Sequence, residues 1–481
     1  MPKAQAFRLT GGLVPHQVLQ RGPDGKGAAE LRGESVHAGR VEARVFSGKE
    51  TLLDWTTIAE LKAADAGGDL EQTQSWSGTL AGIPTGGEYT LELRVLGPTG
   101  TAQGGCEVKK FLVGDVWVLG GQSNMEGCGL LSKPLEKSSP KIKAFSMNEK
   151  WETAAEPLHW LLDSPDSCHW DCKPEDRPRL AEEARRTRKQ GAGLGLTFAK
   201  ELLKRTGVPI GLIPCAHGGT SMEQWNPARA SEGGKSLYGS MLRRIEASGK
   251  RVRGMLWYQG ESETLPEVAE KFSERFRGFV ASVRRDLAQA ELPFYYVQIG
   301  RLVEANRAFV EWNRIQDLQR TLAADLAPGG MVASVDLGLD DLIHISTDGL
   351  QKLGQRLADH VERDLFGNVA LQPGPQLKEV RYENSAKLVV RVRFDAMNGA
   401  LVAHDRLSGF SVHAADGALL PMIFDAALDT KAPGDVILKL TQAPPAGATL
   451  HYGVGLDPFC NLQDERGHAA PVFGPVPIQD A

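Results

Sequence analysis

A nearly unbroken apolar segment, Phe111 to Gly121, constrains the fold more than any other stretch of the chain. It reads FLVGDVWVLGG and is rich in β-branched and aromatic residues. Such a run is typical of a strand buried on both faces of a parallel sheet, because a half-exposed strand would alternate polar and apolar residues. Ser123 follows the terminal Gly120-Gly121 pair. The pattern predicts a hydroxyl at the carboxyl end of a buried strand, where open α/β sheets bind ligands; an ordinary strand-to-loop turn is the alternative.

Strand and helix patterns alternate beyond this segment. Apolar strand candidates lie at residues 209–214, 253–259, 293–299 and 331–337. The clearest helix between them carries apolar residues at steps of three and four, namely Val268, Phe272, Phe276, Phe279, Val283 and Leu287. A last helix is expected at about 349–364. Alternating strands and helices predict a parallel sheet covered on both sides.

The two ends of the chain have a different pattern, with short alternating runs separated by Gly, Pro and Asp. These runs lie at 41–46 and 89–97 before the α/β segment, and at 387–394, 435–440 and 449–454 after it. They are typical of antiparallel β structure. A chain of 481 residues is too long for one core. We therefore predict three domains: an N-terminal β-sandwich (1–110), an α/β domain (111–367) and a C-terminal β-sandwich (368–481).

Composition narrows the classes of function. The chain is 41% hydrophobic and 24% charged, as expected of a soluble globular protein. Its net charge of -5 comes from mixed charges without long runs of one sign, which argues against nucleic acid or an anionic membrane as a partner. No segment is apolar enough to span a bilayer or to serve as a signal peptide. Export stays open, because a leader removed before Met1 would leave no trace, and the sequence does not indicate an oligomeric state.

The six cysteines are too few for a disulfide scaffold. Cys168 and Cys172 flank His169 in the segment CHWDC. Half of a zinc site, a local disulfide and free thiols are the three interpretations of this segment. A second matching pair of ligands does not accompany it, so no metal site is predicted.

Four short segments that follow the predicted strands of the α/β domain supply the groups that acyl transfer needs. Ser123 is the candidate nucleophile in the first. The second, CAHGGTSMEQW at 215–225, contains Gly218-Gly219. Because no Cβ stands in the way, backbone N–H groups at such a turn can approach a developing oxyanion. His217, beside these glycines, is a rival base or a substrate contact.

The third segment, WYQGESE at 257–263, places Gln259 at the end of its strand. A side-chain amide in this position is a candidate donor to an oxyanion. Glu261 has two interpretations: a buried carboxylate that orients a catalytic histidine, or a loop glutamate that accepts hydrogen bonds from nearby backbone N–H groups.

The fourth segment, DDLIHIST at 340–347, precedes the last helix. Two residues separate Asp341 from His344, so one tight loop can bring the carboxylate to Nδ1 of the ring. Nε2 would then take the proton from Ser123 Oγ, as in serine triads. Asp340 competes for the role of the acid, and Thr347 or Asp348 is expected to cap the helix. Together, the four segments predict an acyl-transfer site.

These segments resemble a known family. GDVWVLGGQSNMEG, HGGTSMEQW, WYQGESE and DLIHIST are similar, in order and spacing, to the signature blocks of the sialate O-acetylesterase-like branch of the SGNH (GDSL-type) hydrolases, which also includes acetylxylan esterases. VPHQVLQRG and HYGVGLDPFCNLQDERG resemble the motifs of its terminal β domains, so the likeness covers nearly the whole chain. The resemblance implies a flavodoxin-like three-layer α/β/α domain between two β domains, without a metal or organic cofactor.

The resemblance also implies roles for individual residues. Ser123 is the nucleophile, His344 the general base and acid, and Asp341 the residue that orients it. The backbone N–H groups of Ser123 and Gly219 and the side chain of Gln259 form the oxyanion hole.

The expected function is that of a carbohydrate O-acetylesterase, whose partner is an acetylated carbohydrate such as sialic acid or xylan. His217, Trp225 and Glu261 are candidate substrate contacts, although an aromatic residue in such a segment can equally belong to the core. Two alternatives remain: an esterase for non-carbohydrate acyl esters, and an inactive carbohydrate-binding protein. The chain departs from its relatives at three positions that bear on the acyl and sugar pocket, because Ile345, Gly127 and Glu263 replace the usual Pro, Trp and Asn.

Overall fold

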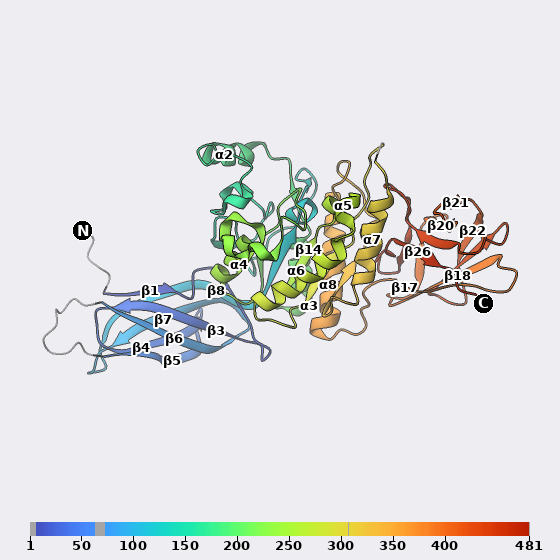
Figure 1. The fold of residues 1–481 in the computed structure, drawn as a ribbon. Helices are drawn as coiled ribbons and strands as arrows, with labels where there is room; N and C mark the ends of the chain where they lie inside the picture. Colours follow the sequence, from blue (N-terminus) through green and yellow to red (C-terminus); the bar gives the residue numbers. More distant parts are fainter. Residues whose placement is uncertain (1–5, 63–72, 306, 481) are drawn as a thin grey trace.

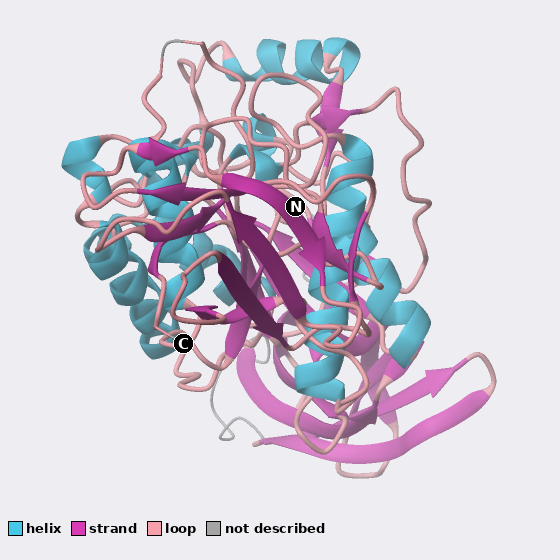
Figure 2. Ribbon diagram, turned by 90° about the vertical axis from the view of Figure 1, so that its right-hand side faces the viewer, coloured by secondary structure: helices cyan, strands magenta, loops and turns pink. Residues whose placement is uncertain are grey.

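The computed structural model describes residues 6–62, 73–305 and 307–480. The chain forms a β region at the N-terminal end, a mixed α/β region in the middle and a second β region at the C-terminal end, one after the other (Figure 1). In Figure 2 the molecule is seen from its C-terminal end, and the helices lie to either side of the strands. The predicted mixed α/β architecture with additional β regions is confirmed.

The sheet of the middle region is built around strand β8 (Ala102–Gly121), whose residues from Phe111 to Gly121 are all buried. The order of the strands is β11-β10-β13-β8-β14-β15-β16. Their bounds are β10 (Ile142–Phe145), β11 (Trp151–Thr153), β13 (Ile210–Pro214), β14 (Gly254–Tyr258), β15 (Phe294–Val297) and β16 (Gly329–Val332). All neighbouring pairs are parallel except β10 with β11. The predicted buried strands are confirmed, but β16 ends at Val332 and a turn follows it, in which Leu337 N–H donates to Ser334 O.

Helices connect these strands. They are α1 (Ser123–Glu126), α2 (Arg177–Thr187), α3 (Gly195–Thr206), α4 (Leu237–Ser248), α5 (Pro266–Ala269), α6 (Phe272–Asp286), α7 (Val310–Leu322) and α8 (Thr347–Phe366). The helix α6 buries Phe272, Phe276 and Phe279, and the ring of Phe279 lies 4.5 Å from that of Trp257 on β14. The predicted apolar face is confirmed for the residues of α6. Val268 belongs to the separate short helix α5, and Leu287 caps α6.

The N-terminal β region shares a strand with the middle region. One of its sheets is β1 (Phe7–Gly11), β3 (Lys26–Ser35) and β6 (Gln74–Pro84). The other strands are β4 (Gly39–Ser47), β5 (Glu50–Leu61) and β7 (Gly86–Leu96), and β7 pairs with the first half of β8. The short strand β2 (Val18–Gln20) also pairs with β8. The predicted boundary at residue 110 therefore falls inside one continuous strand.

The C-terminal β region has its own core, to which two four-stranded sheets contribute. One has the order β17-β18-β23-β22 and the other β21-β20-β24-β26. Their bounds are β17 (Gln376–Tyr382), β18 (Val389–Asp395), β20 (Phe410–His413), β21 (Leu419–Leu420), β22 (Ile423–Leu428), β23 (Asp435–Leu440), β24 (Thr449–Tyr452) and β26 (Phe473–Pro477). The shared core contains Val392 and Leu438 from the first sheet and Leu450 and Tyr452 from the second. The predicted β structure at 387–394, 435–440 and 449–454 is confirmed.

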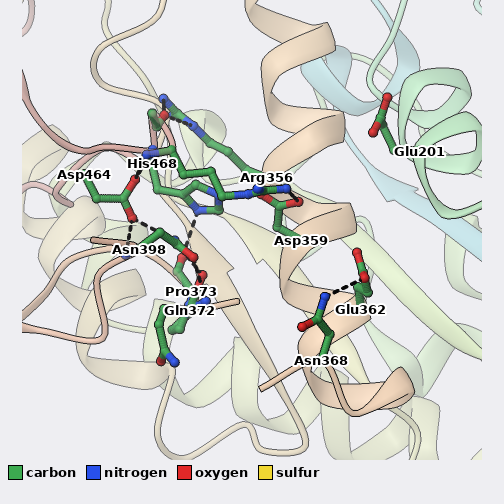
Figure 3. Close-up of polar contacts among 12 residues, drawn as sticks. Glu201, Arg356, Asp359, Glu362, Asn368, Gln372, Pro373, Asn398, Asp464 and His468 are labelled. Atoms are coloured by element: carbon green, nitrogen blue, oxygen red, sulfur yellow. Dashed lines mark hydrogen bonds and ion pairs between the residues drawn. The ribbon is translucent and has the colours of Figure 1, made fainter. Parts of the chain in front are cut away.

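The C-terminal region is fastened to helix α8 by buried polar contacts (Figure 3). Asp359 of α8 accepts hydrogen bonds from Arg466, 2.9 Å from its Nη2, and from the ring of His468, 2.9 Å from its Nε2. Arg356, one turn earlier, donates to Asp336 and to the carbonyl of Gly467 at 2.6 Å each. Within the described ranges, no helix has the length and apolar character needed to cross a membrane.

Candidate active site

Ser123 is the first residue of α1, directly after the carboxyl end of β8. The chain turns there because Gly121 has φ +129° and passes so close to β14 that a Cβ would lie 2.1 Å from Tyr258 O. The backbone N–H of Gln122 donates to the same carbonyl at 2.8 Å. This contact explains the glycine before the serine and leaves the side chain of Ser123 partly exposed.

Asp341 and His344 form a hydrogen-bonded pair in the loop before α8. The distance from His344 Nδ1 to Asp341 Oδ2 is 2.7 Å. The other carboxylate oxygen accepts the N–H groups of Ile343 and His344 at 2.9 and 2.8 Å. Burial opposes ionisation of Asp341, but the hydrogen bonds from the His344 ring and from these two N–H groups outweigh it and lower the pKa of the carboxyl to about 2. An ionised carboxylate at Nδ1 leaves Nε2 as the ring nitrogen available for proton transfer.

The neighbouring Asp340 has a different environment. Its Oδ2 accepts the backbone N–H groups of Leu130 at 2.9 Å and Thr347 at 3.0 Å, and the hydroxyl of Thr347 at 3.3 Å. Leu130 belongs to strand β9 (Gly129–Leu130). Asp340 therefore joins β9 to the start of α8 and does not reach the histidine ring.

Ser346 caps helix α8, so the prediction that Thr347 or Asp348 does so was wrong. The hydroxyl of Ser346 accepts the N–H of Gly349 at 3.2 Å, and its backbone is extended. Thr347 is already helical, and its hydroxyl is shared between Leu130 O at 2.9 Å and Asp340 Oδ2 at 3.3 Å. The cap consequently lies two residues after His344.

Asn124 connects the segment of Ser123 to that of His344. Its side-chain oxygen accepts the N–H of Ile345 at 3.0 Å, and its amide donates to Glu261 Oε1 at 2.9 Å. Within residues 6–62, 73–305 and 307–480, Ser123 Oγ makes no hydrogen bond, so the contact runs through Asn124 rather than directly to His344 Nε2. Sequence reasoning missed this residue, although it is a polar residue within the GQSNM block.

The two glycines of this turn, Gly218 and Gly219, have different surroundings. A Cβ on Gly218 would lie 3.5 Å from the Cβ of Ser123 and 3.2 Å from a carboxylate oxygen of Glu126. The N–H of Gly218 donates to that oxygen at 2.9 Å. Gly219 has φ +67° with open space at its Cβ position, and its N–H has no acceptor among the described residues. Of the two glycines, Gly219 is thus the one with an available donor.

Gln259 is fully buried at the end of β14. Its amide nitrogen lies 3.3 Å from Thr220 O and 3.1 Å from Glu263 Oε1, and it donates to both. Glu263 Oε1 also accepts the N–H of Met222 at 2.7 Å. Glu263 therefore fixes the position of the Gln259 side-chain amide.

Glu261 is also buried, and burial raises its pKa against the opposing effects of Asn124 and His344. Its Oε1 accepts from Asn124, whereas its Oε2 is a buried oxygen without a partner in the described part of the chain. Glu261 thus bears on the His344 segment through Asn124, not through the imidazole itself.

His217 lies at the end of a series of buried side chains that are linked by hydrogen bonds. Its Nδ1 lies 3.2 Å from Nδ1 of His169, whose Nε2 lies 3.3 Å from the hydroxyl of Ser240. Ser240 donates to Asp166 Oδ2 at 2.6 Å, and the ion pair of Asp166 with Arg243 keeps this carboxylate an acceptor.

These contacts determine which nitrogen of His217 carries a proton. Because the hydroxyl of Ser240 donates to a carboxylate, Nε2 of His169 must donate to that hydroxyl. Burial lowers the pKa of His169 well below its usual range, so its Nδ1 is an acceptor and His217 Nδ1 must donate to it. The Nε2 of His217, on the other side of the ring, lies 3.6 Å from the exposed carboxylate of Asp171.

Trp225 is fully buried and offers no ring face to a ligand in this structure. Its ring packs 5.2 Å from that of Trp257, and its indole N–H donates to Thr220 Oγ1 at 2.9 Å. Trp257 and Tyr258 are buried as well. These aromatic residues belong to the core beneath the candidate site.

Of the three interpretations of the CHWDC segment, free thiols is the one that the structure supports. All six cysteines of the chain lie in the described ranges, and all are free, including Cys168 and Cys172. In the described part of the chain no three His, Cys, Asp or Glu side chains gather in a way that could hold a metal ion.

A serine at the end of a parallel strand, tied to a loop with an Asp–His pair, is an arrangement typical of serine ester hydrolases. Comparison with known proteins identifies the family. The profile described as "Carbohydrate esterase, sialic acid-specific acetylesterase" matches residues 113–363, just over half of the chain. The chain belongs to this family. It is a carboxylic-ester hydrolase of the carbohydrate O-acetylesterase type.

Individual relatives agree with this assignment. A probable carbohydrate esterase of Arabidopsis thaliana is 29% identical over 265 residues, which are 50% of this chain and 88% of the relative. The sialate O-acetylesterase of Pongo abelii is 24% identical over 334 residues, which are 61% of this chain but only 57% of that enzyme. The crystal structure of a carbohydrate acetylesterase from Xanthomonas citri has 22% identity and a TM-score of 0.66, and the match covers 97% of this chain and 99% of that one. This solved structure shares the fold along nearly the whole chain.

Proposed function

We propose that Ser123, His344 and Asp341 are the catalytic triad of this esterase. Ser123 Oγ attacks the acetyl carbonyl while His344 Nε2 accepts the proton. The imidazolium, stabilised by Asp341, returns the proton to the departing sugar hydroxyl and leaves an acetyl-serine. Water then attacks this ester by the same route and releases acetate. The observation that carries the proposal is the 2.7 Å hydrogen bond between Asp341 and His344, in a loop that Asn124 holds against the Ser123 segment.

The proposed oxyanion hole consists of the backbone N–H groups of Ser123 and Gly219 and the side chain of Gln259. The unengaged N–H of Gly219 supports its part in this. Both N–H groups of the Gln259 amide already donate, to Thr220 O and Glu263, so Gln259 contributes only when one of these bonds is exchanged. The two backbone donors are therefore the main part of the proposal.

The finer architecture follows the same proposal. The order β13-β8-β14-β15-β16 corresponds to 2-1-3-4-5 when these strands are numbered along the chain, which supports a flavodoxin-like α/β/α domain. We assign residues 111–367 to it. The shared core of the two C-terminal sheets supports a sandwich at 368–481, and residues 1–110 form a second one.

The proposed substrate is an acetylated sugar, for which sialic acid and xylan are the first candidates. The description of the matching family and the names of the relatives support this choice. We assign His217 a contact to a sugar hydroxyl, because it directly precedes the glycine turn that faces Ser123. Glu261, which is buried and bound to Asn124, acts on the position of the site rather than on the sugar.

Acetate release from acetylated xylan, xyloglucan and sialic acid, measured beside an aryl acetate, tests this function. The Ser123→Ala variant should lose roughly 10⁶-fold in kcat, and a fluorophosphonate probe should label the wild-type protein but not this variant. Labelling that persists in Ser123→Ala would assign the nucleophile to another residue. Hydrolysis of the aryl ester without release of acetate from any glycan would favour an esterase for other esters.

A further inference from the structure

Exposed apolar side chains occur in the loops at the sheet end that carries the candidate active site, and in a segment of the C-terminal region that is bound to one of these loops. We call Leu265, Val303, Phe309, Val310, Leu342 and Phe459 the rim surface. Their exposed fractions range from 43% for Phe309 to 68% for Phe459. The first five lie in the segments after β14, β15 and β16, at the sheet end that carries Ser123. Phe459 comes from the C-terminal β region. Clustered exposed apolar residues of this kind mark binding surfaces.

The rim surface is continuous with the loop of the proposed triad. Leu342 lies between Asp341 and His344 in sequence, and its side chain is 55% exposed. The N–H of Val303 donates to the carbonyl of Leu342 at 2.8 Å. The exposed side chains of Leu342 and Val303 therefore belong to two neighbouring loops, one of which carries the Asp341–His344 pair.

The surface continues onto the C-terminal β region. The N–H of Leu302 donates to Leu456 O at 2.8 Å, and Arg301 forms an ion pair with Asp457. Phe459 follows two residues later. Asn313 of α7 fixes the same segment, because it accepts the N–H of Gly455 at 2.8 Å and donates to Gly453 O at 3.2 Å.

The C-terminal region, which carries Phe459, is also joined to α8. This helix begins three residues after His344, and its Asp359 binds Arg466 and His468 of the C-terminal region. Figure 3 shows His468 between Asp359 and the backbone at Pro373, where its Nδ1 lies 3.2 Å from the carbonyl oxygen. The exposed ring of Phe459 therefore lies in a stretch of chain that is hydrogen-bonded on both sides, at 453–455 to α7 and at 466–468 to α8.

We propose that Leu342, Val303 and Phe459 bind the sugar units that flank the acetylated unit, so that the C-terminal β region selects glycan chains over acetylated monosaccharides. This inference rests on the proposed function. The occupant is a glycan because the acetylated unit must lie at Ser123, and its neighbours in the chain then lie on the surface that adjoins it. The C–H faces of sugar rings and the methyl groups of further acetyl esters match apolar side chains, and the Arg301–Asp457 pair next to them offers partners to hydroxyls.

The test compares Phe459→Ala with a matched control, Phe424→Ala. Phe424 lies on β22 of the same region, and its side chain is 57% exposed, but it is remote in sequence from the 453–459 segment. For each protein, kcat/KM is measured with acetylated xylo-oligosaccharides of increasing length and with p-nitrophenyl acetate. Binding of the longest oligosaccharide is measured by calorimetry in the Ser123→Ala background, with and without Phe459→Ala.

We expect Phe459→Ala to lower the ratio of kcat/KM for long oligosaccharides to that for the aryl ester about tenfold, as the loss of one aromatic contact implies. Phe424→Ala should leave this ratio unchanged. Equal loss for both substrates, no dependence on chain length, or unchanged calorimetric affinity would overturn the inference. If oligosaccharides bind through Phe459 but the wild-type protein releases no acetate from them, the proposed function fails while the binding surface stands.

Discussion

Two adjacent aspartates, Asp340 and Asp341, bind different kinds of partner in this protein. Asp341 binds the imidazole of His344, whereas Asp340 accepts three hydrogen bonds from Leu130 and Thr347. The residues are of one type and lie in one loop. The sequence alone leaves open which of them serves the histidine, because either can reach a ring three or four positions later.

Because the two aspartates have different roles, the same substitution should affect mainly kcat at Asp341 and mainly stability at Asp340. Asp341→Asn should lower kcat for an acetyl ester by about 10⁴-fold, because an amide favours the wrong tautomer of the histidine. Asp340→Asn should reduce the free energy of unfolding by about 1–3 kcal/mol, because an amide N–H then faces N–H donors, with a smaller loss of kcat. Steady-state kinetics and thermal unfolding of both variants measure the two effects. The reverse order in kcat would assign the acid to Asp340.

Asn124 predicts a coupled loss of stability and activity. Asn124→Ala removes the only hydrogen bond that the structure, in its described residues, gives to the side chain of Glu261, and it releases the N–H of Ile345. A buried carboxylate without a partner should cost about 1–3 kcal/mol, and kcat should fall because the His344 segment loses its attachment to the Ser123 segment. Glu261→Gln in the Asn124→Ala background should recover stability but not kcat. Unchanged kcat in Asn124→Ala would show that the attachment is not needed.

At the scale of elements, helix α8 joins the chemistry to the scaffold. Its cap, Ser346, lies between His344 and eleven buried residues of the helix. Ser346→Ala should cost about 1 kcal/mol of stability and lower kcat moderately, since fraying of the first turn loosens the loop. Ser346→Asp, which keeps an acceptor for the N–H of Gly349, is the matched control and should retain both properties. Circular dichroism melts with steady-state kinetics provide the readout, and equal losses in the two variants would exclude capping as the cause.

The predictability of the elements depended on the length of their patterns. β8 and α6 were found from sequence because a long buried run and a regular apolar face each leave one solution. The ends of elements were less predictable. Ser346 caps α8, whereas the hydroxyl of Thr347 donates to Leu130 O, a tertiary contact that no local pattern shows. Asn124 and the partners of Gln259 were missed for the same reason, since residues from distant segments determine what a buried amide binds.

At the scale of the whole molecule, the regions are joined more closely than the change in sequence pattern suggests. β8 begins beside β7 of the N-terminal region and ends two residues before Ser123 in the central sheet, so a single strand belongs to both regions. The C-terminal region is joined through Asp359, whose partners Arg466 and His468 lie more than one hundred residues later. The division at residues 110 and 367 stays a prediction, and a cut at residue 110 would divide β8 and remove the part of it that pairs with β2.

The junction at Asp359 predicts a dependence of stability on pH. Burial opposes ionisation of this carboxyl, but hydrogen bonds from Arg466 and His468 and the charge of Arg205 outweigh it and lower its pKa below the usual value of 3.8. A folded-state pKa below the unfolded one stabilises the protein above the unfolded pKa, and this contribution is lost as the pH falls towards the folded one. Asp359→Asn should cost about 3 kcal/mol at pH 6, because it removes the buried carboxylate that Arg205 and Arg466 share.

The control for this prediction is Asp325→Asn, which breaks an exposed pair with Arg277 and should change stability by less than about 1 kcal/mol. Thermal unfolding of the three proteins between pH 6 and pH 3 separates the cases. The difference in Tm between the wild-type protein and Asp359→Asn should narrow as the pH falls, because the unfolded wild-type chain takes up a proton at Asp359 before the folded protein does, which reduces the stability that the carboxylate contributes. A difference that widens on acidification would mean that Asp359 is neutral in the folded protein, so that ion pairs of this carboxylate would not join the C-terminal region to α8.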